Sequence, residues 1–307
     1  MPGQRNAATP GATRSAEAEL RERLAQGPPL LLDGATGTEL ERRGVPSELP
    51  LWSARALLEA PELLARIHAE YVAAGAEVVT ANTFRTQRRT LAHAGLADRA
   101  RELTRCAVEL VRRSAQGAPR RIFVAGSMAP LEDCWRPDRV PKDEALAREH
   151  AEHAENLRAA GVDLLLLETF GTLREALAAL RAARTSGLPV WASFACDAQG
   201  RLLSGEPLAE ALAAARALGP LALLVNCLPP SHVEPALAAL RACWLPFGVY
   251  PNLGAPTAGG KGRTEELDPA ALAALTRRWV AAGARIVGGC CGTTPAHLRA
   301  LAGASPG

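Results

Sequence analysis

The sequence predicts a single (β/α)8 barrel, the TIM-barrel form of the α/β class. Three segments, at 73–79, 159–165 and 281–287, share one pattern of two alanines, a glycine and a short apolar run. This pattern is typical of a helix that ends at a left-handed glycine and leads directly into a buried strand. Eight apolar runs alternate with helical patterns, which favours a closed barrel over an open doubly wound sheet. Periodicity alone does not show closure, so the open sheet remains the alternative.

The predicted elements alternate between strand and helix along the chain. We expect strands at 30–33, 77–82, 122–127, 163–168, 190–195, 221–227, 246–252 and 285–289. We expect helices at 61–74, 96–115, 143–160, 172–185, 207–217, 231–242 and 268–282. Runs such as 164–167 and 221–225 are apolar without a break, as expected of parallel strands that are covered on both faces.

The chain divides into a short extension and one large domain. Residues 1–26 are rich in alanine, arginine, glycine, proline and threonine, and they contain no apolar core segment. We expect this extension to be disordered, and it has no secretory signal pattern. No linker or change in composition divides residues 27–307, which we expect to form the barrel domain.

Composition excludes several classes of function. The chain has 307 residues, 48% of them hydrophobic and 22% charged, with a formal net charge of +3. Its arginines are spread without a basic block, so nucleic-acid binding is not indicated. No apolar run reaches the roughly 18–20 residues of a membrane span, and we expect no membrane association. The partners expected are small-molecule substrates, and the sequence does not decide between a monomer and a homo-oligomer.

The seven cysteines are odd in number and scattered, which fits a reducing, cytoplasmic location in which thiols act as ligands or nucleophiles. Three of them, Cys106, Cys196 and Cys243, are expected to pack in the core. Cys134 is expected in a loop, either free or at the mouth of the site. Two histidines, His150 and His153, lie three residues apart on a predicted helix, and we expect them to face solvent.

Polar residues collect where the predicted strands end. In barrels of this kind the active site lies at the C-terminal ends of the strands. The residues found there are Asp33, Asn82, Thr83, Ser127, Glu168, Cys196, Asn226, Cys227, Asn252, Cys290 and Cys291. Apolar strands that end in acids, amides and thiols indicate a functional site.

The segment at 288–294 is the most informative of these strand ends. Neighbouring side chains of a regular strand point to opposite faces, so Cys290 and Cys291 converge only if the strand has ended in an irregular turn, which the flanking glycines permit. Cys227 ends another strand on the same rim. Three thiolates with an open fourth position are typical of a reactive Zn2+ site. Zinc binding deprotonates a thiol whose ordinary pKa is about 8.5. Core packing or a redox pair of cysteines remains the alternative.

The chain resembles the homocysteine S-methyltransferases over almost its whole length, from about residue 30 to 301. The strongest motifs are DGATGTEL at 33–40, VNC at 225–227 and GGCCG at 288–292. Support comes from LWSA at 51–54, TANTF at 80–84, LLET at 166–169 and YPN at 250–252. Each motif is weak alone, but their order along a barrel-like frame is specific.

The resemblance implies that Cys227, Cys290 and Cys291 are zinc ligands, and that methyl transfer to homocysteine gives methionine. It also implies that Asp33 and Glu168 bind the amino-acid end of homocysteine. A carboxylate such as Glu168 can pair with the substrate ammonium. Backbone amides of the loop that begins at Gly34 can receive the substrate carboxylate.

Two further residues are expected at the substrate. Asn226, beside Cys227, is expected either to orient the rim loops or to contact substrate. Trp52 lies where betaine-dependent members of the family also have a tryptophan. An ordinary strand-ending turn at Gly34 and a structural ion pair at Glu168 remain the alternatives for those positions.

The methyl donor is the least determined part of the prediction. S-methylmethionine or S-adenosylmethionine is favoured, because the LWSA motif and the single-domain length resemble that subgroup. Arg85 stands where relatives have an aromatic residue, and its charge is expected to repel a cationic donor. Betaine and a methylcorrinoid partner stay open as donors. Two other functions also stay open: a metal-dependent barrel hydrolase and a non-catalytic zinc- or thiol-binding barrel.

Overall fold

The computed structural model describes residues 15–253 and 267–304, and it is a closed barrel of parallel strands. The strands are β1 (Leu30–Leu31), β2 (Val78–Ala81), β3 (Phe123–Met128), β4 (Leu164–Phe170), β5 (Val190–Phe194), β6 (Ala222–Asn226), β7 (Phe247–Tyr250) and β8 (Ile286–Val287). They pair in the order β1-β8-β7-β6-β5-β4-β3-β2. Backbone bonds from Asp33 to Val78 (3.0 Å) and from Glu77 to Leu31 (2.8 Å) join β1 to β2. The predicted (β/α)8 barrel is confirmed, and the open sheet is excluded.

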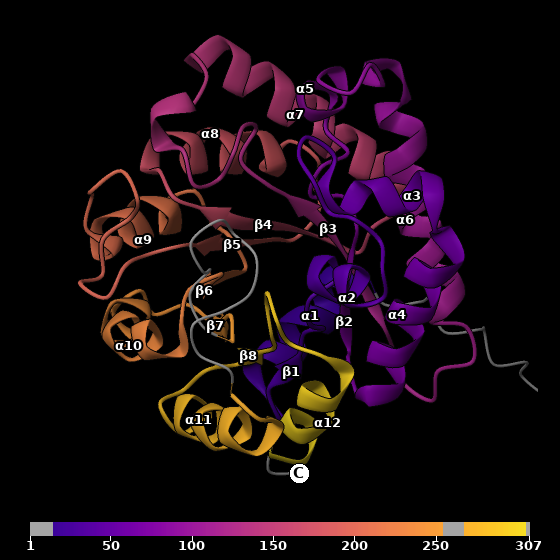
Figure 1. Cartoon of the computed structure of the whole chain (residues 1–307). Coiled ribbons are helices and arrows are strands. Elements are labelled where there is room, and N and C mark those ends of the chain that lie inside the picture. Colours follow the sequence, from indigo (N-terminus) through magenta and orange to yellow (C-terminus); the bar gives the residue numbers. More distant parts are fainter. Residues whose placement is uncertain (1–14, 254–266, 305–307) are drawn as a thin grey trace, which may run out of the picture.

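Helices surround the ring of strands (Figure 1). They are α1 (Ala16–Ala25), α2 (Gly37–Arg42), α3 (Ala56–Glu59), α4 (Pro61–Ala74), α5 (Arg88–Ala92), α6 (Ala100–Ser114), α7 (Asp143–Ala160), α8 (Leu173–Arg184), α9 (Leu208–Arg216), α10 (Val233–Ala242), α11 (Pro269–Ala281) and α12 (Pro295–Ala304). All seven predicted helices are present, and α4 and α7 have the predicted bounds. Within the described ranges, no helix is both long and apolar enough to cross a bilayer.

The repeated alanine–alanine–glycine segments form the expected turns. Gly75, Gly161 and Gly283 have φ values of 119°, 82° and 108°. These values lie in the region that residues with a Cβ rarely occupy. Each glycine ends a helix and lets the chain enter the next strand within a few residues, which sets the regular spacing of the barrel.

The apolar core has two separate layers. Alternate residues of each strand point into the barrel, where Leu30, Leu32, Leu164 and Leu166 pack with Trp191. The other set of strand residues packs outward against the helices in a second cluster. Both faces of the strands are therefore buried, which explains why their sequences are apolar without a break.

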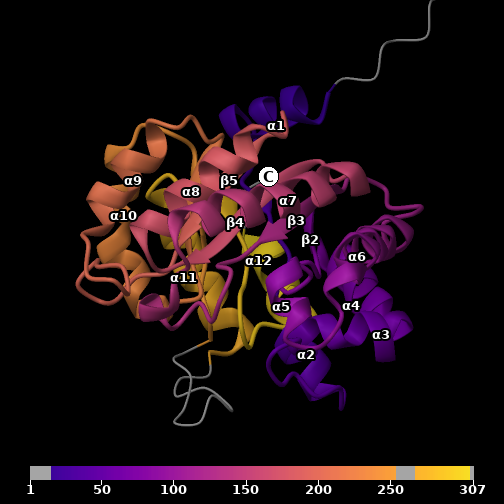
Figure 2. The same ribbon diagram turned by 90° about the horizontal axis from the view of Figure 1, so that it is seen from above.

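Helix α1 closes the N-terminal end of the barrel, as the view turned by 90° shows (Figure 2). Leu20 and Leu24 are 0% and 3% exposed and belong to the cluster inside the barrel. Arg285, just before β8, donates from its guanidinium to the backbone oxygens of Leu24 (3.0 Å) and Gly27 (2.8 Å). The expectation of a disordered extension over 1–26 is therefore wrong for this helix. Residues 1–14 lie outside the described residues.

The two histidines of α7 are buried, contrary to the expectation that they face solvent. His150 and His153 are 1% and 2% exposed. The Nε2 of His150 lies 3.4 Å from a carboxylate oxygen of Glu175, and that oxygen accepts the Leu131 N–H (2.8 Å). The Nε2 of His153 lies 3.2 Å from the Ser127 carbonyl oxygen. A spacing of three residues marks one helix face, and here that face packs against the barrel.

Candidate active site

A cavity of about 1350 Å³ opens at the C-terminal ends of the strands. This is larger than the roughly 300–1,000 Å³ of a pocket for one drug-sized ligand, so it has room for two small substrates. The predicted strand-end residues that line it are Asp33, Asn82, Ser127, Glu168, Cys227, Asn252, Cys290 and Cys291. Three others, Thr83, Cys196 and Asn226, are buried and do not line the cavity.

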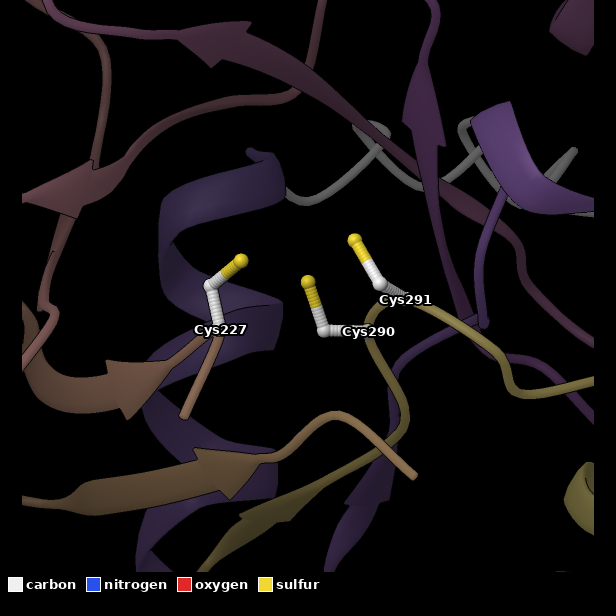
Figure 3. A group of neighbouring side chains, drawn as sticks. All are labelled: Cys227, Cys290 and Cys291. Atoms are coloured by element: carbon white, nitrogen blue, oxygen red, sulfur yellow. The ribbon is translucent and has the colours of Figure 1, made fainter. Parts of the chain in front are cut away.

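Three thiols converge at this cavity, and their sulfur atoms point into one space (Figure 3). The Sγ atoms of Cys227, Cys290 and Cys291 lie within 4.8 Å of one another. Cys227 follows β6 directly and has a φ of 56°, in the left-handed region that costs a non-glycine residue on the order of 1–3 kcal/mol. Such strain at a cavity indicates a geometry held for function.

The turn after β8 brings the two adjacent cysteines to the same side. A Cβ on Gly288 would lie 2.8 Å from the Leu32 backbone oxygen, and one on Gly289 would lie 2.4 Å from Thr293 Oγ1. These two glycines are therefore required by close packing. The Cys290 N–H donates to the Pro251 carbonyl (2.8 Å) and the Cys291 N–H to Asn252 Oδ1 (3.0 Å). The irregular turn is thus fixed by hydrogen bonds that its backbone amides donate to one backbone and one side-chain oxygen.

The thiols perturb one another. Hydrogen bonding with Cys290 and Cys291, and then burial, raises the pKa of Cys227 well above its ordinary value. Three thiolates do not form together in so small a volume without a cation to balance them. A divalent metal ion would supply that charge and deprotonate its thiol ligands.

Glu168 lies near the C-terminal end of β4 and is partly exposed to the cavity. Its carboxylate accepts a hydrogen bond from the Ser127 hydroxyl. Burial raises the pKa of Glu168 to about 7, the Ser127 bond lowers it, and the charge of Cys291 raises it further. Near neutral pH the carboxyl is therefore ready to ionise when a cation binds beside it.

Asp33 lies on the same wall, directly after β1. Its two carboxylate oxygens accept the N–H of Thr80 (2.8 Å) and the Thr80 hydroxyl (2.9 Å). Burial raises the pKa of Asp33 to about 8, although the two hydrogen bonds from Thr80 lower it. The negative charge of Glu168 adds to the increase. Two buried carboxyl groups with raised pKa values form a site that a single cation stabilises.

Gly34 is held tightly between neighbouring side chains. A Cβ at this position would lie 2.8 Å from both Thr293 Oγ1 and the Tyr71 ring. The next amide, that of Ala35, already donates to Thr293 Oγ1 (3.1 Å). Packing accounts for the glycine, and the Ala35 amide has a protein partner.

Asn226 does not reach the cavity. It is 0% exposed, and its Oδ1 accepts the Thr169 N–H (2.9 Å) and the Ser193 hydroxyl (2.7 Å). Its Nδ2 donates to Thr169 Oγ1 (2.9 Å). Thr169 has a φ of 63° and follows Glu168. Of the two roles expected for Asn226, the structure supports orienting a strand end.

Trp52 lines the cavity with an aromatic partner. Its ring meets Phe84 edge-on, with centroids 5.4 Å apart and an interplanar angle of 68°. A Cβ on Gly37 would lie 2.4 Å from the indole, so this glycine makes room for Trp52. Arg85 lies beside the pair, with its guanidinium carbon 5.2 Å from the Phe84 centroid.

Sequence reasoning assigned no role to several residues of the cavity wall. Asn252 Nδ2 is buried and has no hydrogen-bond partner among the described residues, whereas the buried Tyr250 hydroxyl lies close enough to Glu168 to lower the pKa of that carboxyl. Both residues lie in the YPN motif at the end of β7. Cys134, expected in a loop or at the site mouth, does line the cavity. The motif marked the strand end, but only the fold shows which polar atoms there lack a partner.

Comparison with known proteins places the chain in a family. A model of the family "Homocysteine S-methyltransferase" matches residues 30–305. The homocysteine S-methyltransferase of Escherichia coli is 36% identical over 293 residues, covering 89% of this chain and 94% of that protein. The methionine synthase of Mycobacterium tuberculosis is 34% identical and is matched over 24% of its length, so this chain spans about a quarter of that protein.

A solved structure shows the same architecture. The homocysteine methyltransferase MmuM of Escherichia coli, in its metallated form, superposes with a TM-score of 0.78 at 33% identity. The match covers 91% of this chain and 97% of that one. The resemblance seen in the sequence motifs is confirmed, and the chain belongs to the homocysteine S-methyltransferase family.

Proposed function

We propose that this protein transfers a methyl group from a small-molecule donor to the thiolate of homocysteine, giving methionine. The observation that carries this proposal is the convergence of the Cys227, Cys290 and Cys291 sulfurs within 4.8 Å at the wall of a cavity large enough for two substrates. The names of the relatives support the acceptor, and the metallated form of the Escherichia coli enzyme supports a metal.

Zinc is the metal that these ligands fit best. Thiolates are soft ligands that favour zinc over magnesium or calcium. Zn–S bonds are about 2.3 Å long, so sulfurs this close need only small side-chain adjustments to share an ion. When bound, zinc would hold the homocysteine thiol as a reactive thiolate in the position that the three cysteines leave open.

The carboxyl groups on the wall supply the binding site for the amino-acid end of homocysteine. Glu168 and Asp33 are partly protonated near neutral pH, and a substrate ammonium between them favours the charged form of each. Asn226 positions Glu168 through its three hydrogen bonds at Thr169 and Ser193. Backbone amides of the loop that contains Gly34, other than the Ala35 amide that donates to Thr293 Oγ1, receive the substrate carboxylate.

The transfer itself needs no protein nucleophile. The homocysteine thiolate attacks the donor methyl carbon, a new C–S bond forms, and the old bond breaks with its electron pair returning to the donor. With S-methylmethionine the leaving group is a neutral thioether, so charge balances without a proton transfer. We favour S-methylmethionine or S-adenosylmethionine, and betaine or a methylcorrinoid are the competing donors.

The test is methionine formation by reduced, zinc-loaded protein with homocysteine and each donor in separate reactions. We expect turnover with a sulfonium donor. Turnover with betaine or a methylcorrinoid alone would change the donor and keep the reaction class. Bound zinc without methionine from any donor would favour a non-catalytic barrel, and hydrolysis of an ester or amide by the same protein would favour a hydrolase.

A further inference from the structure

Arg85 is a buried cation in the wall of the cavity. Its side chain is 5% exposed, and it lines the cavity with Phe84, Cys134 and Trp135. The other arginine on this wall, Arg42, is half-exposed and pairs with a glutamate. Arg85 therefore offers a positive charge that is shielded from solvent at the place where substrates bind.

Part of this guanidinium has no hydrogen-bond partner among residues 15–253 and 267–304. Its Nη1 donates to the Glu132 carbonyl oxygen (2.9 Å), while its Nε is buried and makes no hydrogen bond within the part of the chain that the structure describes. Nearby carboxylates are engaged elsewhere. Glu132 pairs with Arg89 (3.1 Å), and Asp133 accepts the Trp135 N–H (3.0 Å).

A guanidinium in this position needs an anion. Arginine stays charged at any physiological pH, and a buried charge is costly unless it is paired. The Phe84 ring at 5.2 Å compensates part of that cost. The unused N–H groups match the paired oxygens of a carboxylate. The wall is therefore built to receive an acidic group from outside the protein.

The neighbours of Arg85 show which ligand brings that group. The Phe84 ring beside Arg85 also packs against Trp52, and all three residues line the cavity. Aromatic faces attract sulfonium and ammonium groups. Cys134 lies within electrostatic range of both Arg85 and Cys291, so the anion position adjoins the thiols. The acceptor's carboxyl and amino groups are already accounted for by Glu168, Asp33 and the loop amides in the proposed function.

We propose that Arg85 binds the carboxylate of the methyl donor, so that the cavity selects a zwitterionic donor with its cationic methyl group at the aromatic pair. This inference rests on the proposed function for the identity of the second ligand. It makes Arg85 a residue that determines donor specificity, and it reverses the expectation that this charge only repels donors.

The test measures donor binding by isothermal titration calorimetry, in which each ligand is titrated into zinc-loaded protein. Homocysteine is left out, so that no turnover occurs. The two ligands are S-methylmethionine and its carboxamide, which keeps the sulfonium but lacks the carboxylate charge. In Arg85→Met we expect binding of S-methylmethionine to weaken about 10- to 100-fold, the range for loss of a charge-assisted hydrogen bond. Binding of the carboxamide should stay within about twofold, because it never used the charge.

Two further variants make the result specific. Arg88→Met removes a half-exposed arginine that pairs with Glu152 and Asp98 outside the cavity, and it should bind both ligands as the parent does. Arg85→Lys keeps the charge without the guanidinium fork, so it should show a smaller loss that is still confined to S-methylmethionine. This variant carries the test if Arg85→Met does not fold.

Equal weakening of both ligands, or of neither, would overturn the inference and leave Arg85 as a support for the loop at Glu132. The proposed function fails separately. If Arg85→Met weakens only the binding of S-methylmethionine but the parent protein forms no methionine after homocysteine is added, the anion site is supported. The proposed methyl transfer is then rejected.

Discussion

At its N-terminal end the barrel is filled by Leu20 and Leu24 of α1, whereas at its C-terminal end the same strands lead into Asp33, Glu168 and the three thiols. The interior of the first end is filled by leucines, and the carboxylates around it, such as Asp163, are paired with arginines. The second end keeps raised carboxyl pKa values, buried polar atoms without partners and strained backbone. The contrast teaches that stability and chemistry are separated along the barrel axis, so each end can be changed without the other.

The largest effect is expected at the thiol end. Cys291→Ala removes one of three converging sulfurs and should lower zinc content and activity by more than the roughly 10–100-fold typical of outer-shell changes. The unfolding midpoint of the metal-free protein should hardly move. Zinc content by atomic emission and methionine formation are the measurements. Cys243→Ala, which removes a buried thiol outside the cavity, should keep both, and full retention in Cys291→Ala would refute the ligand assignment.

The opposite end should affect stability alone. Leu20→Ala leaves a cavity inside the barrel and should lower the free energy of unfolding by about 2–5 kcal/mol. Denaturant unfolding measures this, while the KM for homocysteine should not change. Arg21→Ala, on the exposed face of the same helix and paired with Glu17, should cost less than about 1 kcal/mol. A raised KM in Leu20→Ala would show that the two ends are coupled.

Glu168→Gln tests the C-terminal end of the barrel alone, because it removes a negative charge and keeps the volume of the side chain almost unchanged. Loss of the carboxylate should raise the KM for homocysteine about 10- to 100-fold, because a charged hydrogen bond to the substrate ammonium is removed. Steady-state kinetics measure this. With 4-mercaptobutyrate, which lacks the ammonium, the variant and the parent should have the same KM. A structural role for Glu168 would raise both.

The smallest effect is a dependence on pH. Burial raises the pKa of Glu168 to about 7, so below pH 7 the carboxyl must release a proton before it pairs with the ammonium. The KM for homocysteine should therefore rise as pH falls from 8 to 6, by about tenfold in all for one proton with this pKa. Ionisation of the substrate thiol adds to this in every variant. In Glu168→Gln the slope should be shallower, and an unchanged slope would assign the whole effect to the thiol.

Much of the functional end could be predicted because its signals are local. The glycines at 75, 161 and 283 mark turns by their conformational requirement, and the polar residue after each apolar run marks a strand end. Adjacent cysteines between glycines imply an irregular turn. The pairing of Cys227 with that turn needed only the rule that strand ends share a rim.

What the sequence did not reveal depends on contacts between distant segments. In α1, Leu20 and Leu24 have the spacing of a buried helix face, but the charged and small residues around them make the segment resemble a disordered tail. His150 and His153 share one helix face, yet only the position of Glu175 and Ser127 shows that this face is buried. Asn226 follows the rule for strand ends, but it is still within β6 and bonds Thr169 of β4 and Ser193 of β5, which depends on how these strands lie together.

The most direct test of the zinc–thiolate account is X-ray absorption at the zinc edge, with and without homocysteine. We predict three sulfur ligands and one lighter ligand in the resting protein, and four sulfur ligands after homocysteine is added. A sulfur count that stays at three while homocysteine is bound would contradict the account, since the thiol would then not be activated at Cys227, Cys290 and Cys291.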